Sequence, residues 1–408
     1  MKMDRVVVVG ASLAGLRAAE TLRNEGFGGQ VVVVGAEQHR PYDRPPLSKK
    51  VLAGEWEPER IYLRQPDSFD ELDVEWRLGV AAAGLDLDGG ILHLADGTDI
   101  LFDGCIIATG AVCRQLAEQS RHAHVHELRT LDDSMRLRAE LSGGDHHAVV
   151  IGAGFIGLEV AATAKQLGNR VTVLEGAPAP LIRGLGPEMG AAIGAMHAER
   201  GVDIRCGVQV EGLHEDGVLL AGGELIESDL VVVGIGVVPA TAWLDDSGLE
   251  IRDGIVCDAT LNARSIDGGV RRGVYAAGDV LRWPNHLFDE EMRVEHWTNA
   301  AEQGAAAARN LLAVSSGNEP EPYAPVPFFW SDQFDIRVQF LGCSSPEDDV
   351  HVAAGSVDDG KFLALYRTGD KLHGALGVNS PRWVMKMRGS LAAGASWADA
   401  IAVAENFE

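Results

Sequence analysis

Gly10-Ala-Ser-Leu-Ala-Gly15 and Gly152-Ala-Gly-Phe-Ile-Gly157 are the two stretches that decide the fold of this 408-residue chain. Each follows a Val/Ile-rich run, which is typical of a buried strand, and precedes an Ala-rich run, which is typical of a helix. An acidic residue, Glu37 or Glu175, closes a second strand at roughly the 20-residue distance that dinucleotide-binding folds use. This doubled order of strand, glycine turn, helix, strand and acid predicts two Rossmann units and two bound dinucleotides.

The glycines of these turns make room for the pyrophosphate of a dinucleotide. Its negative charges bind unpaired backbone N–H groups at a helix N-terminus, and a Cβ would hold it away. The first turn has Ser12 in the middle position, where a small hydroxyl can itself bond a phosphate oxygen. One such turn alone is as often a packing feature, but two complete units favour nucleotide binding. We expect contacts to the first nucleotide from Gly10, Ser12, Leu13, Ala14 and Gly15, and to the second from Gly152, Gly154, Ile156 and Gly157.

The two acids are expected to bind ribose. A carboxylate accepts hydrogen bonds from ribose hydroxyls and repels a 2′-phosphate, so Glu175 favours NADH over NADPH at the second site. An isolated glutamate at a strand end is often only solvated, but the paired spacing of Glu37 and Glu175 favours a binding role.

Composition bounds the class of protein. Hydrophobic residues make up 46% and charged residues 23% of the chain, as in an ordinary globular protein of two or three domains. The net charge of −25 argues against nucleic-acid binding. The apolar run Val6–Val9 is broken by Gly10 and followed by Arg17, so it predicts a first strand rather than a signal peptide. We expect a cytoplasmic protein without a membrane segment.

The five cysteines contain no closely spaced pair, and none precedes Cys105. This spacing predicts neither a redox disulfide near the first nucleotide nor a metal or cluster bound by cysteines. We expect buried, reduced thiols and no metal site.

The order of strand and helix signals predicts a discontinuous first domain. A buried strand in residues 100–110 ends in the turn Thr109-Gly110, and a second βαβ unit runs from Ala148 to Gly236. A strand over 273–277, the turn Gly278-Asp279 and a helix over about 299–312 then return to the first domain. Beyond a linker at 315–322, short alternating segments predict an antiparallel sheet covered by one terminal helix. The expected strands are 328–330, 336–340, 350–352 and 362–366, and the helix carries Trp383, Met387, Leu391 and Trp397.

We therefore predict an α/β fold with two Rossmann-type dinucleotide-binding domains, arranged as in glutathione reductase, plus a C-terminal α+β domain. The first domain is expected to comprise residues 1–115 and 243–318, the second residues 116–242, and the C-terminal domain residues 319–408.

Six segments together resemble the FAD-containing, NADH-dependent ferredoxin reductases of oxygenase systems over nearly the whole chain. They are Pro41-Tyr-Asp-Arg-Pro-Pro-Leu-Ser-Lys49, Ala108-Thr-Gly110, Gly152 to Glu159, Tyr275-Ala-Ala-Gly-Asp279, Glu295-His-Trp-Thr-Asn299 and Phe329-Trp-Ser-Asp-Gln333. The resemblance implies FAD in the domain formed by 1–115 and 243–318, NADH in 116–242, and an interface role for 319–408.

The resemblance also implies site residues. Arg44 and Lys49 would reach the flavin, and Asp279 would accept hydrogen bonds from the ribityl chain. Further FAD contacts are implied for Glu37, Ala82, Thr109, Gly110, Arg129, Gly278 and Trp297, with Trp330 near the flavin; NADH contacts are implied for Glu159, Glu175, Arg183 and Gly236.

Lys49 and Glu159 are the implied catalytic pair beside the flavin. A cation there stabilises negative charge that develops on a reduced flavin. Each residue also has an alternative, purely structural explanation. Glu159 can act only as a favourable charge near a helix N-terminus, worth roughly 0.3–1 kcal/mol, and Lys49-Lys50 can be a solvated helix start.

The implied reaction is hydride transfer from NADH to FAD, followed by single-electron transfer to an iron–sulfur ferredoxin that feeds a cytochrome monooxygenase or a ring-hydroxylating dioxygenase. Ferredoxins of this kind are usually acidic, so a basic docking face is expected on a monomer or weak dimer. Its candidates are Arg382, Lys386 and Arg388, with Arg60, Arg64 and Arg309.

Other readings share the two-nucleotide architecture. An NADH oxidase or coenzyme A disulfide reductase would carry a redox cysteine near the first nucleotide, and no cysteine precedes Cys105. A rubredoxin reductase differs only in its acceptor. A regulatory flavoprotein of the apoptosis-inducing-factor type would reduce artificial acceptors slowly.

Overall fold

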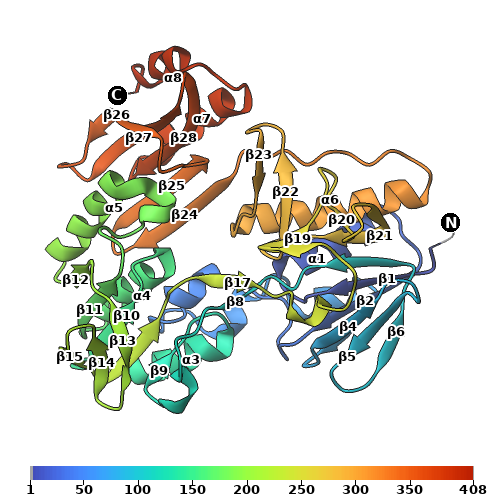
Figure 1. Cartoon of the computed structure of the whole chain (residues 1–408), viewed down its shortest axis with the longest axis horizontal. Coiled ribbons are helices and arrows are strands. Elements are labelled where there is room, and N and C mark those ends of the chain that lie inside the picture. The colour runs from blue at the N-terminus through green and yellow to red at the C-terminus, as the bar shows by residue number, and fades with distance from the viewer. Residues whose placement is uncertain (1–2, 408) are drawn as a thin grey trace. The chain divides into compact units, whose positions relative to one another are not determined.

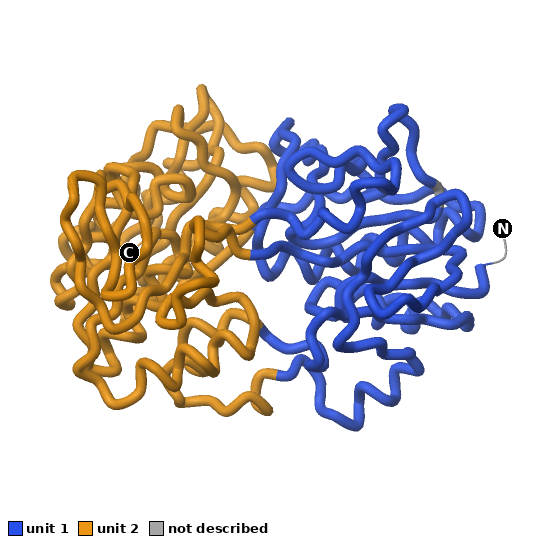
Figure 2. The backbone as a smooth tube through the Cα atoms, turned by 60° about the horizontal axis from the view of Figure 1, so that its bottom comes forward, with its two compact units in different colours: residues 1–43, 62–112, 238–327 blue, residues 44–61, 113–237, 328–408 orange. Residues whose placement is uncertain are grey.

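The computed structural model of the chain describes residues 3–407 and divides them into two compact units, coloured separately in Figure 2. Unit 1 comprises the residues up to Asp43, Tyr62–Val112 and Val238–Pro327, and unit 2 comprises Arg44–Ile61, Cys113–Val237 and the residues from Phe328 on. The Pro-rich segment that carries Lys49 therefore belongs to the same unit as the second glycine turn.

A parallel sheet forms the centre of unit 1 (Figure 1). Its strand order is β20-β21-β7-β1-β2-β3, in which only β20 runs antiparallel to its neighbour. The strands are β1 (Arg5–Val9), β2 (Gln30–Gly35), β3 (Glu75–Leu78), β7 (Gly104–Ile107), β20 (Asn262–Arg264) and β21 (Val270–Ala276). The valine runs of β1 and β2 are buried, as expected of parallel strands covered on both faces. The order reverses between β1 and β7, which is the position where Rossmann folds bind their ligand.

Helices α1 (Leu13–Asn24) and α6 (Trp297–Ser315) pack closely in unit 1. A Cβ added to Gly304 of α6 would lie 2.2 Å from the carbonyl oxygen of Ala14 in α1. The small residues of both helices thus allow a backbone-to-backbone approach at the N-terminal end of α1.

Unit 2 contains the second Rossmann sheet, with the order β12-β11-β10-β16-β9 and parallel pairing throughout. Its strands are β9 (Val125–His126), β10 (His147–Ile151), β11 (Arg170–Glu175), β12 (Asp203–Cys206) and β16 (Leu230–Val233), and its helices are α3 (Leu131–Leu141), α4 (Phe155–Gln166) and α5 (Ile182–Glu199). The sheet repeats the strand–glycine turn–helix order of unit 1, as the sequence predicts.

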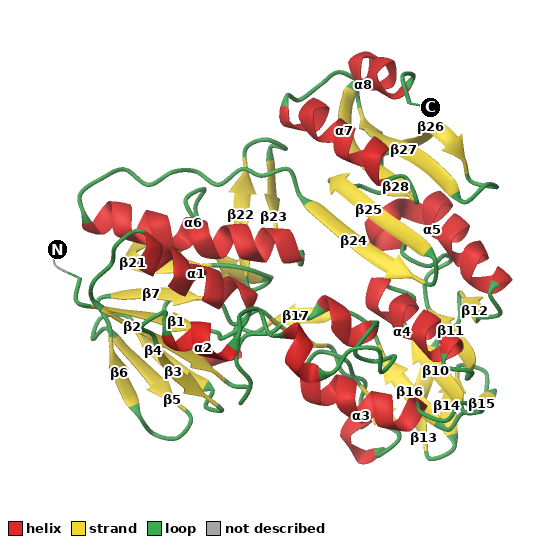
Figure 3. Ribbon diagram, turned by 180° about the vertical axis from the view of Figure 1, so that it is seen from behind, coloured by secondary structure: helices red, strands yellow, loops and turns green. Residues whose placement is uncertain are grey.

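The C-terminal part of unit 2 is an antiparallel sheet with the order β24-β25-β28-β27-β26 (Figure 3). Its elements are β24 (Phe328–Gln333), β25 (Ile336–Gly342), β26 (Asp349–Ser356), β27 (Lys361–Thr368), β28 (Lys371–Val378), α7 (Pro381–Ala392) and α8 (Trp397–Ala404). Together with the two Rossmann sheets, this sheet confirms the predicted fold class.

Two details of the C-terminal prediction are wrong. The central strand β28 was not expected, because its sequence carries Gly374 and Gly377 and is buried almost continuously instead of alternating. The single terminal helix is two helices, since Gly394 adopts a φ of 61° and Ser396 caps α8 by accepting a hydrogen bond from the N–H of Asp399. Trp397 therefore begins a separate helix.

The C-terminal sheet shares one hydrophobic core with the second Rossmann sheet. Val150 and Val173 of the parallel sheet, Leu185 of α5 and Phe340 of β25 belong to the same buried cluster. The Tyr366 hydroxyl in β27 also donates a hydrogen bond to the carbonyl of Leu185 at 2.7 Å. The C-terminal sheet is thus fixed to α5 and to the second Rossmann sheet.

Smaller elements complete the described chain. The helices are α2 (Pro66–Asp70) and the 3₁₀ helices η1 (Pro45–Ser48), η2 (Pro58–Ile61), η3 (Gln119–Arg121) and η4 (Ala242–Leu244). Two small sheets have three strands each: one contains β4 (Ala82–Asp86), β5 (Ile91–Leu94) and β6 (Asp99–Leu101), and the other contains β13 (Val210–His214), β14 (Gly217–Leu220) and β15 (Leu225–Glu227). A two-stranded sheet pairs β8 (Ala111–Cys113) with β17 (Val237–Pro239), and a four-stranded sheet contains β18 (Ile251–Arg252), β19 (Gly254–Val256), β22 (Leu281–Asn285) and β23 (Glu290–Met292). Among residues 3–407, no helix combines the length and hydropathy that spanning a bilayer requires.

The five cysteines are all free thiols. Cys105 and Cys257 are buried as expected, whereas Cys113, Cys206 and Cys343 are partly exposed, which corrects the prediction of five buried thiols.

Gly304→Ala tests the close packing of α6 on α1. The added methyl group meets the Ala14 carbonyl, so we expect a loss of about 1–3 kcal/mol of unfolding free energy, as overpacking usually causes. Urea denaturation followed by circular dichroism measures this loss.

Gly389→Ala in α7 is the matched control, because nothing lies within 4 Å of its added Cβ. An exposed helical glycine gains about 0.4–1 kcal/mol on this substitution. Equal stability changes in the two variants would contradict the described contact.

Candidate nucleotide and hydride-transfer site

The first glycine turn joins β1 to α1 through a backbone path that only glycine follows. Gly10 has a φ of 123°, and a Cβ there would lie 2.0 Å from the carbonyl oxygen of Ala108. A Cβ on Gly15 would lie 1.8 Å from the carbonyl oxygen of Gly10. Ser12 is the N-cap of α1, and Leu13 and Ala14 begin the helix. The predicted residues therefore present a helix N-terminus, where an anionic group is stabilised.

The second turn repeats this construction between β10 and α4. A Cβ on Gly152 would lie 2.4 Å from the carbonyl oxygen of Gly234, and one on Gly157 would lie 2.1 Å from the carbonyl oxygen of Gly152. Gly154, the N-cap of α4, is different, because no atom lies within 4 Å of its added Cβ. The chain's own packing does not require this glycine, and the space that it leaves fits an approaching pyrophosphate. Ile156 beside it is 50% exposed.

The two predicted ribose-binding acids are held in place by hydrogen bonds. The Tyr42 hydroxyl donates to Glu37 Oε2 at 2.5 Å. Glu175 accepts the backbone N–H groups of Ala153 at 2.7 Å and Ala177 at 2.8 Å, so its carboxylate also braces the second glycine turn. An ionised carboxylate has about four lone-pair sites, which leaves capacity for ribose hydroxyls.

In unit 1 the Gly278-Asp279 turn is anchored by a residue that the sequence analysis missed. Gly278 has a φ of 82°, and its N–H donates to Gln303 Oε1 at 2.9 Å. Within residues 3–407, the buried Gln303 Nε2 has no hydrogen-bond partner. A buried donor without a partner is costly, so an acceptor on a bound ligand fits this position. The signal was a polar residue on the buried face of an Ala-rich helix.

The remaining predicted residues of unit 1 line turns and element ends. Thr109 Oγ1 donates to the carbonyl of Ala240 at 3.0 Å, Gly110 has a φ of 70°, and Ala82 begins β4. Trp297 Nε1 donates to Asp43 Oδ1 at 2.6 Å.

The histidine beside Trp297 is neutral at physiological pH. Burial lowers the pKa of His296 to about 4, although the negative charge of Asp279 acts in the opposite direction.

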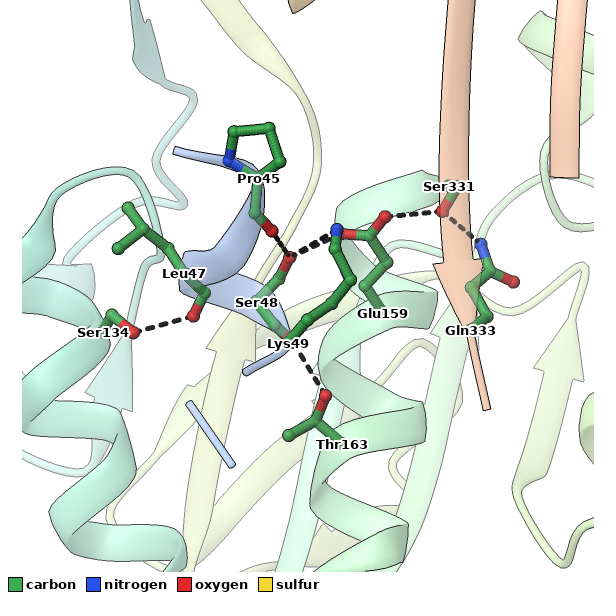
Figure 4. Close-up of polar contacts among 9 residues, drawn as sticks. All are labelled: Pro45, Leu47, Ser48, Lys49, Ser134, Glu159, Thr163, Ser331 and Gln333. Atoms are coloured by element: carbon green, nitrogen blue, oxygen red, sulfur yellow. Dashed lines mark hydrogen bonds and ion pairs between the residues drawn. The ribbon is translucent and has the colours of Figure 1, made fainter. Parts of the chain in front are cut away.

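In unit 2 the Pro-rich segment brings Lys49 to Glu159 on the first turns of α4 (Figure 4). Lys49 Nζ lies 2.7 Å from Glu159 Oε2, and the two side chains are 19% and 3% exposed. The pairing that the resemblance implies is therefore present, while its catalytic role stays a prediction. The Arg44 guanidinium in the same segment donates to the backbone carbonyl of Arg129.

Two hydroxyl groups that the sequence analysis did not single out complete the environment of Glu159. Ser48 Oγ donates to Oε2 at 2.5 Å, and Ser331 Oγ in β24 donates to Oε1 at 2.6 Å. The segment is fixed by further bonds, since Thr163 Oγ1 donates to the Ser48 carbonyl and Ser134 Oγ to the Leu47 carbonyl, at 2.8 and 2.7 Å. A buried charge needs such donors, because leaving water costs several kcal/mol per ion.

Other predicted residues occupy the outside of unit 2. Arg183 is exposed and lies in the first turn of α5, and the helix kinks at Gly186, where φ is 75°. Gly236 is exposed after β16, with a φ of 95°, and Trp330 stacks on Phe328 with ring centroids 6.1 Å apart.

The candidate docking cations differ in availability. Arg382, Lys386 and Arg388 are exposed on α7, and Arg60 and Arg309 are also exposed. Arg64 is partly buried and forms an ion pair with Glu20 at 2.8 Å, a carboxylate that Arg17 also contacts at 2.6 Å.

Comparison with known proteins gives a consistent picture. Residues 4–304 match the family model described as pyridine nucleotide-disulphide oxidoreductase, and residues 328–408 match the reductase C-terminal model. Rhodocoxin reductase of Rhodococcus erythropolis is 36% identical over 95% of this chain and 89% of its own length. The ferredoxin–NAD(+) reductase component of the anthranilate 1,2-dioxygenase system of Burkholderia cepacia is 35% identical over 97% and 96%. The crystal structure of the covalent putidaredoxin reductase–putidaredoxin complex has a TM-score of 0.90 and 32% identity, covering 99% of both chains.

Lys49→Met should strongly destabilise the protein, because it leaves the Glu159 carboxylate buried without its cation. We expect a loss of about 3–5 kcal/mol in chemical denaturation, as for other broken buried pairs. The double variant Lys49→Met/Glu159→Gln should lose less, since no unpaired charge remains.

Lys50→Met is the matched control. Lys50 is exposed and its Nζ lies over the Trp56 ring, 4.7 Å from the centroid. A loss of at most about 1 kcal/mol is expected for such a contact. A double variant less stable than Lys49→Met would contradict the buried-charge account.

Proposed function

The chain belongs to the pyridine nucleotide-disulphide oxidoreductase family, and on that premise we propose that it is an NADH-dependent, FAD-containing ferredoxin reductase that supplies an oxygenase. The observation that carries this proposal is the pair of glycine turns, each with an acid at the following strand end, in a chain that aligns over nearly its whole length with ferredoxin reductases of oxygenase systems.

We assign the predicted domains to the two nucleotides. Residues 1–115 and 243–318 bind FAD, residues 116–242 bind NADH, and residues 319–408 form the interface domain. When bound, FAD accepts a hydride from NADH and passes the electrons singly to a one-electron carrier.

The chain's own groups hold the first nucleotide. The N-terminus of α1 binds the pyrophosphate and Glu37 the ribose, while Asp279 and the unpaired Nε2 of Gln303 offer an acceptor and a donor near Gly278. The other proposed FAD contacts are Gly10, Ser12, Leu13, Ala14, Gly15, Arg44, Lys49, Ala82, Thr109, Gly110, Arg129 and Trp297.

The second nucleotide meets the N-terminus of α4. Glu175 binds its ribose, and Gly154 leaves the space for its pyrophosphate. The other proposed NADH contacts are Gly152, Ile156, Gly157, Glu159, Arg183 and Gly236.

Lys49 and Glu159 have complementary roles in this proposal. Glu159 fixes the position of Lys49 Nζ, and Lys49 supplies a positive charge to the flavin site. No general base is needed, because the chain contributes orientation and charge placement.

The cysteines support electron transfer without a redox disulfide. All five are free, and burial raises the pKa of the Cys105 thiol to about 12 and that of Cys113 to about 11. Neither thiol gives a reactive thiolate at neutral pH. This disfavours a disulfide reductase of the coenzyme A type.

Two further proposals concern the cellular compartment and the oligomeric state of the protein. Free thiols are typical of a reducing compartment, so we place the protein in the cytoplasm. We also propose a monomer or weak dimer. Six large apolar side chains are exposed among the described residues. They are Leu101, Val112, Ile156, Ile266, Val270 and Met385.

Glu175→Gln should reduce the preference for NADH over NADPH. The amide oxygen can keep one of the two backbone N–H bonds that Glu175 accepts, but the substitution removes the charge that repels a 2′-phosphate. We expect the ratio of kcat/KM for NADH and NADPH to fall by about tenfold, the effect of one hydrogen bond to a charged group.

Glu37→Gln is the control for this measurement. It should weaken retention of FAD and leave the NADH to NADPH ratio unchanged. A shifted ratio in Glu37→Gln, with none in Glu175→Gln, would reverse the assignment of the two nucleotide sites.

Ferredoxin-dependent reduction of cytochrome c by NADH tests the function and its docking face. Arg382→Glu/Lys386→Glu should lower this rate by about tenfold at low salt and flatten its salt dependence, because the acidic ferredoxin loses its attraction. Reduction of ferricyanide, which needs no docking, should be unchanged.

Arg121→Glu, at a side chain 71% exposed in η3, is a control charge reversal outside α7 and should leave both rates unchanged. If Arg382→Glu/Lys386→Glu also leaves the rate and its salt dependence unchanged, α7 is not the docking face. No ferredoxin-dependent reduction by the wild-type protein would refute the function itself.

A further inference from the structure

The second carboxylate oxygen of Glu159 is bound by a strand that lies outside both Rossmann sheets. Ser331 Oγ donates to Glu159 Oε1 at 2.6 Å, and Ser331 sits in β24, the first strand of the C-terminal sheet. Both side chains are buried. The carboxylate is thus held from two sides, by Lys49 and Ser48 at Oε2 and by the C-terminal sheet at Oε1.

Gln333 controls the direction in which the Ser331 hydroxyl points. The two residues are two apart on β24, so their side chains project to the same face. Gln333 Nε2 donates to Ser331 Oγ at 3.0 Å (Figure 4). Because that N–H occupies a lone pair of the hydroxyl oxygen, the hydroxyl proton is directed to Glu159.

His197 fixes Gln333 in turn. His197 Nε2 lies 2.7 Å from Gln333 Oε1, and both side chains are buried. Burial lowers the pKa of His197, so the ring is neutral, and the Nε2 that faces a carbonyl oxygen carries its proton. The amide then presents its oxygen to α5 and its nitrogen to Ser331.

The three bonds form one directed chain. Donation runs from His197 Nε2 to Gln333 Oε1, from Gln333 Nε2 to Ser331 Oγ, and from the Ser331 hydroxyl to Glu159 Oε1. Every donor points toward the carboxylate, and buried hydrogen bonds in such a chain polarise one another. A carboxylate fixed in advance needs no reorganisation when hydride is transferred.

We propose that Ser331 and Gln333 are positioning residues for hydride transfer: the C-terminal sheet sets the orientation of Glu159, and through it that of Lys49. This inference rests on the proposed function. It gives the C-terminal domain a part in the reaction with NADH, in addition to any part in docking the acceptor.

Ser331→Ala tests the inference in the FAD-loaded protein by stopped-flow reduction with NADH. We expect the limiting rate of flavin reduction to fall about ten- to a hundredfold, the effect of losing a hydrogen bond to a charged group, with little change in the dissociation constant for NAD⁺. Gln333→Leu keeps the Ser331 hydroxyl but frees its rotation, so the limiting rate should fall by less than in Ser331→Ala. If Ser331→Ala does not fold, Gln333→Leu tests the inference in its place.

Ser380→Ala is the matched control for a merely structural effect. Ser380 is buried at the start of α7 and donates to the Phe362 carbonyl at 2.6 Å, without contact to Glu159. Its rate should stay within about twofold of wild type, which is under 0.5 kcal/mol of barrier. Equal rates in Ser331→Ala and Ser380→Ala would overturn the inference.

Two further measurements separate positioning from the function itself. In a Glu159→Gln background, Ser331→Ala should add no further loss of rate, because the effect acts through the carboxylate; a full additional loss would overturn the inference. The infrared difference spectrum between Ser331→Ala and wild type should show shifted carboxylate bands, because Glu159 loses a hydrogen bond. These bands should be missing when the same comparison is made in the Glu159→Gln background. Unshifted carboxylate bands in Ser331→Ala would also overturn the inference. If wild-type flavin is not reduced by NADH at all, the proposed function fails instead.

Discussion

The burial of the Glu159 carboxylate is the constraint on which the site depends. A charge that is 3% exposed must be offset by donors at short range, because the loss of hydration costs several kcal/mol. Lys49 and Ser48 from the Pro-rich segment and Ser331 from the C-terminal sheet provide them. Two segments far apart in the sequence therefore converge on α4, and the shared hydrophobic core of the C-terminal sheet and α5 stabilises that arrangement.

The glycine turns impose the second constraint, and the structure separates two reasons for glycine. Gly15 and Gly157 are needed by the chain itself, since any Cβ would collide with a carbonyl oxygen of the same turn. Gly154 faces open space, so the packing of the chain does not require a glycine there, and the space leaves room for a ligand. In the first turn Ser12 stands at the position that corresponds to Gly154, and its hydroxyl can hydrogen-bond a phosphate oxygen. The repeated motif thus places two helix N-termini where anions can bind, and the two differ in the residue at the middle position of the turn.

Local patterns predicted the parts of the fold that local forces determine. Both Rossmann units and the acids at the ends of their second strands follow from hydrophobic runs and turn spacing, which act over about 20 residues. The missed features depend on distant partners. Ser331 and Glu159 are 172 residues apart, and no periodicity predicts that a hydroxyl in an alternating strand will meet a buried carboxylate. Gln303 and β28 were missed for the same reason, because burial in the assembled structure decides their roles.

The central claim is that this chain passes hydride directly from NADH to its own bound FAD. Anaerobic stopped-flow mixing of the purified protein with NADH and with NADH deuterated at nicotinamide C4 tests it most directly. The account predicts that one equivalent of NADH bleaches the flavin absorbance and that deuteration slows the bleaching by a primary isotope effect. A preparation that binds no flavin on reconstitution, or a bound flavin that NADH leaves oxidised, would contradict it.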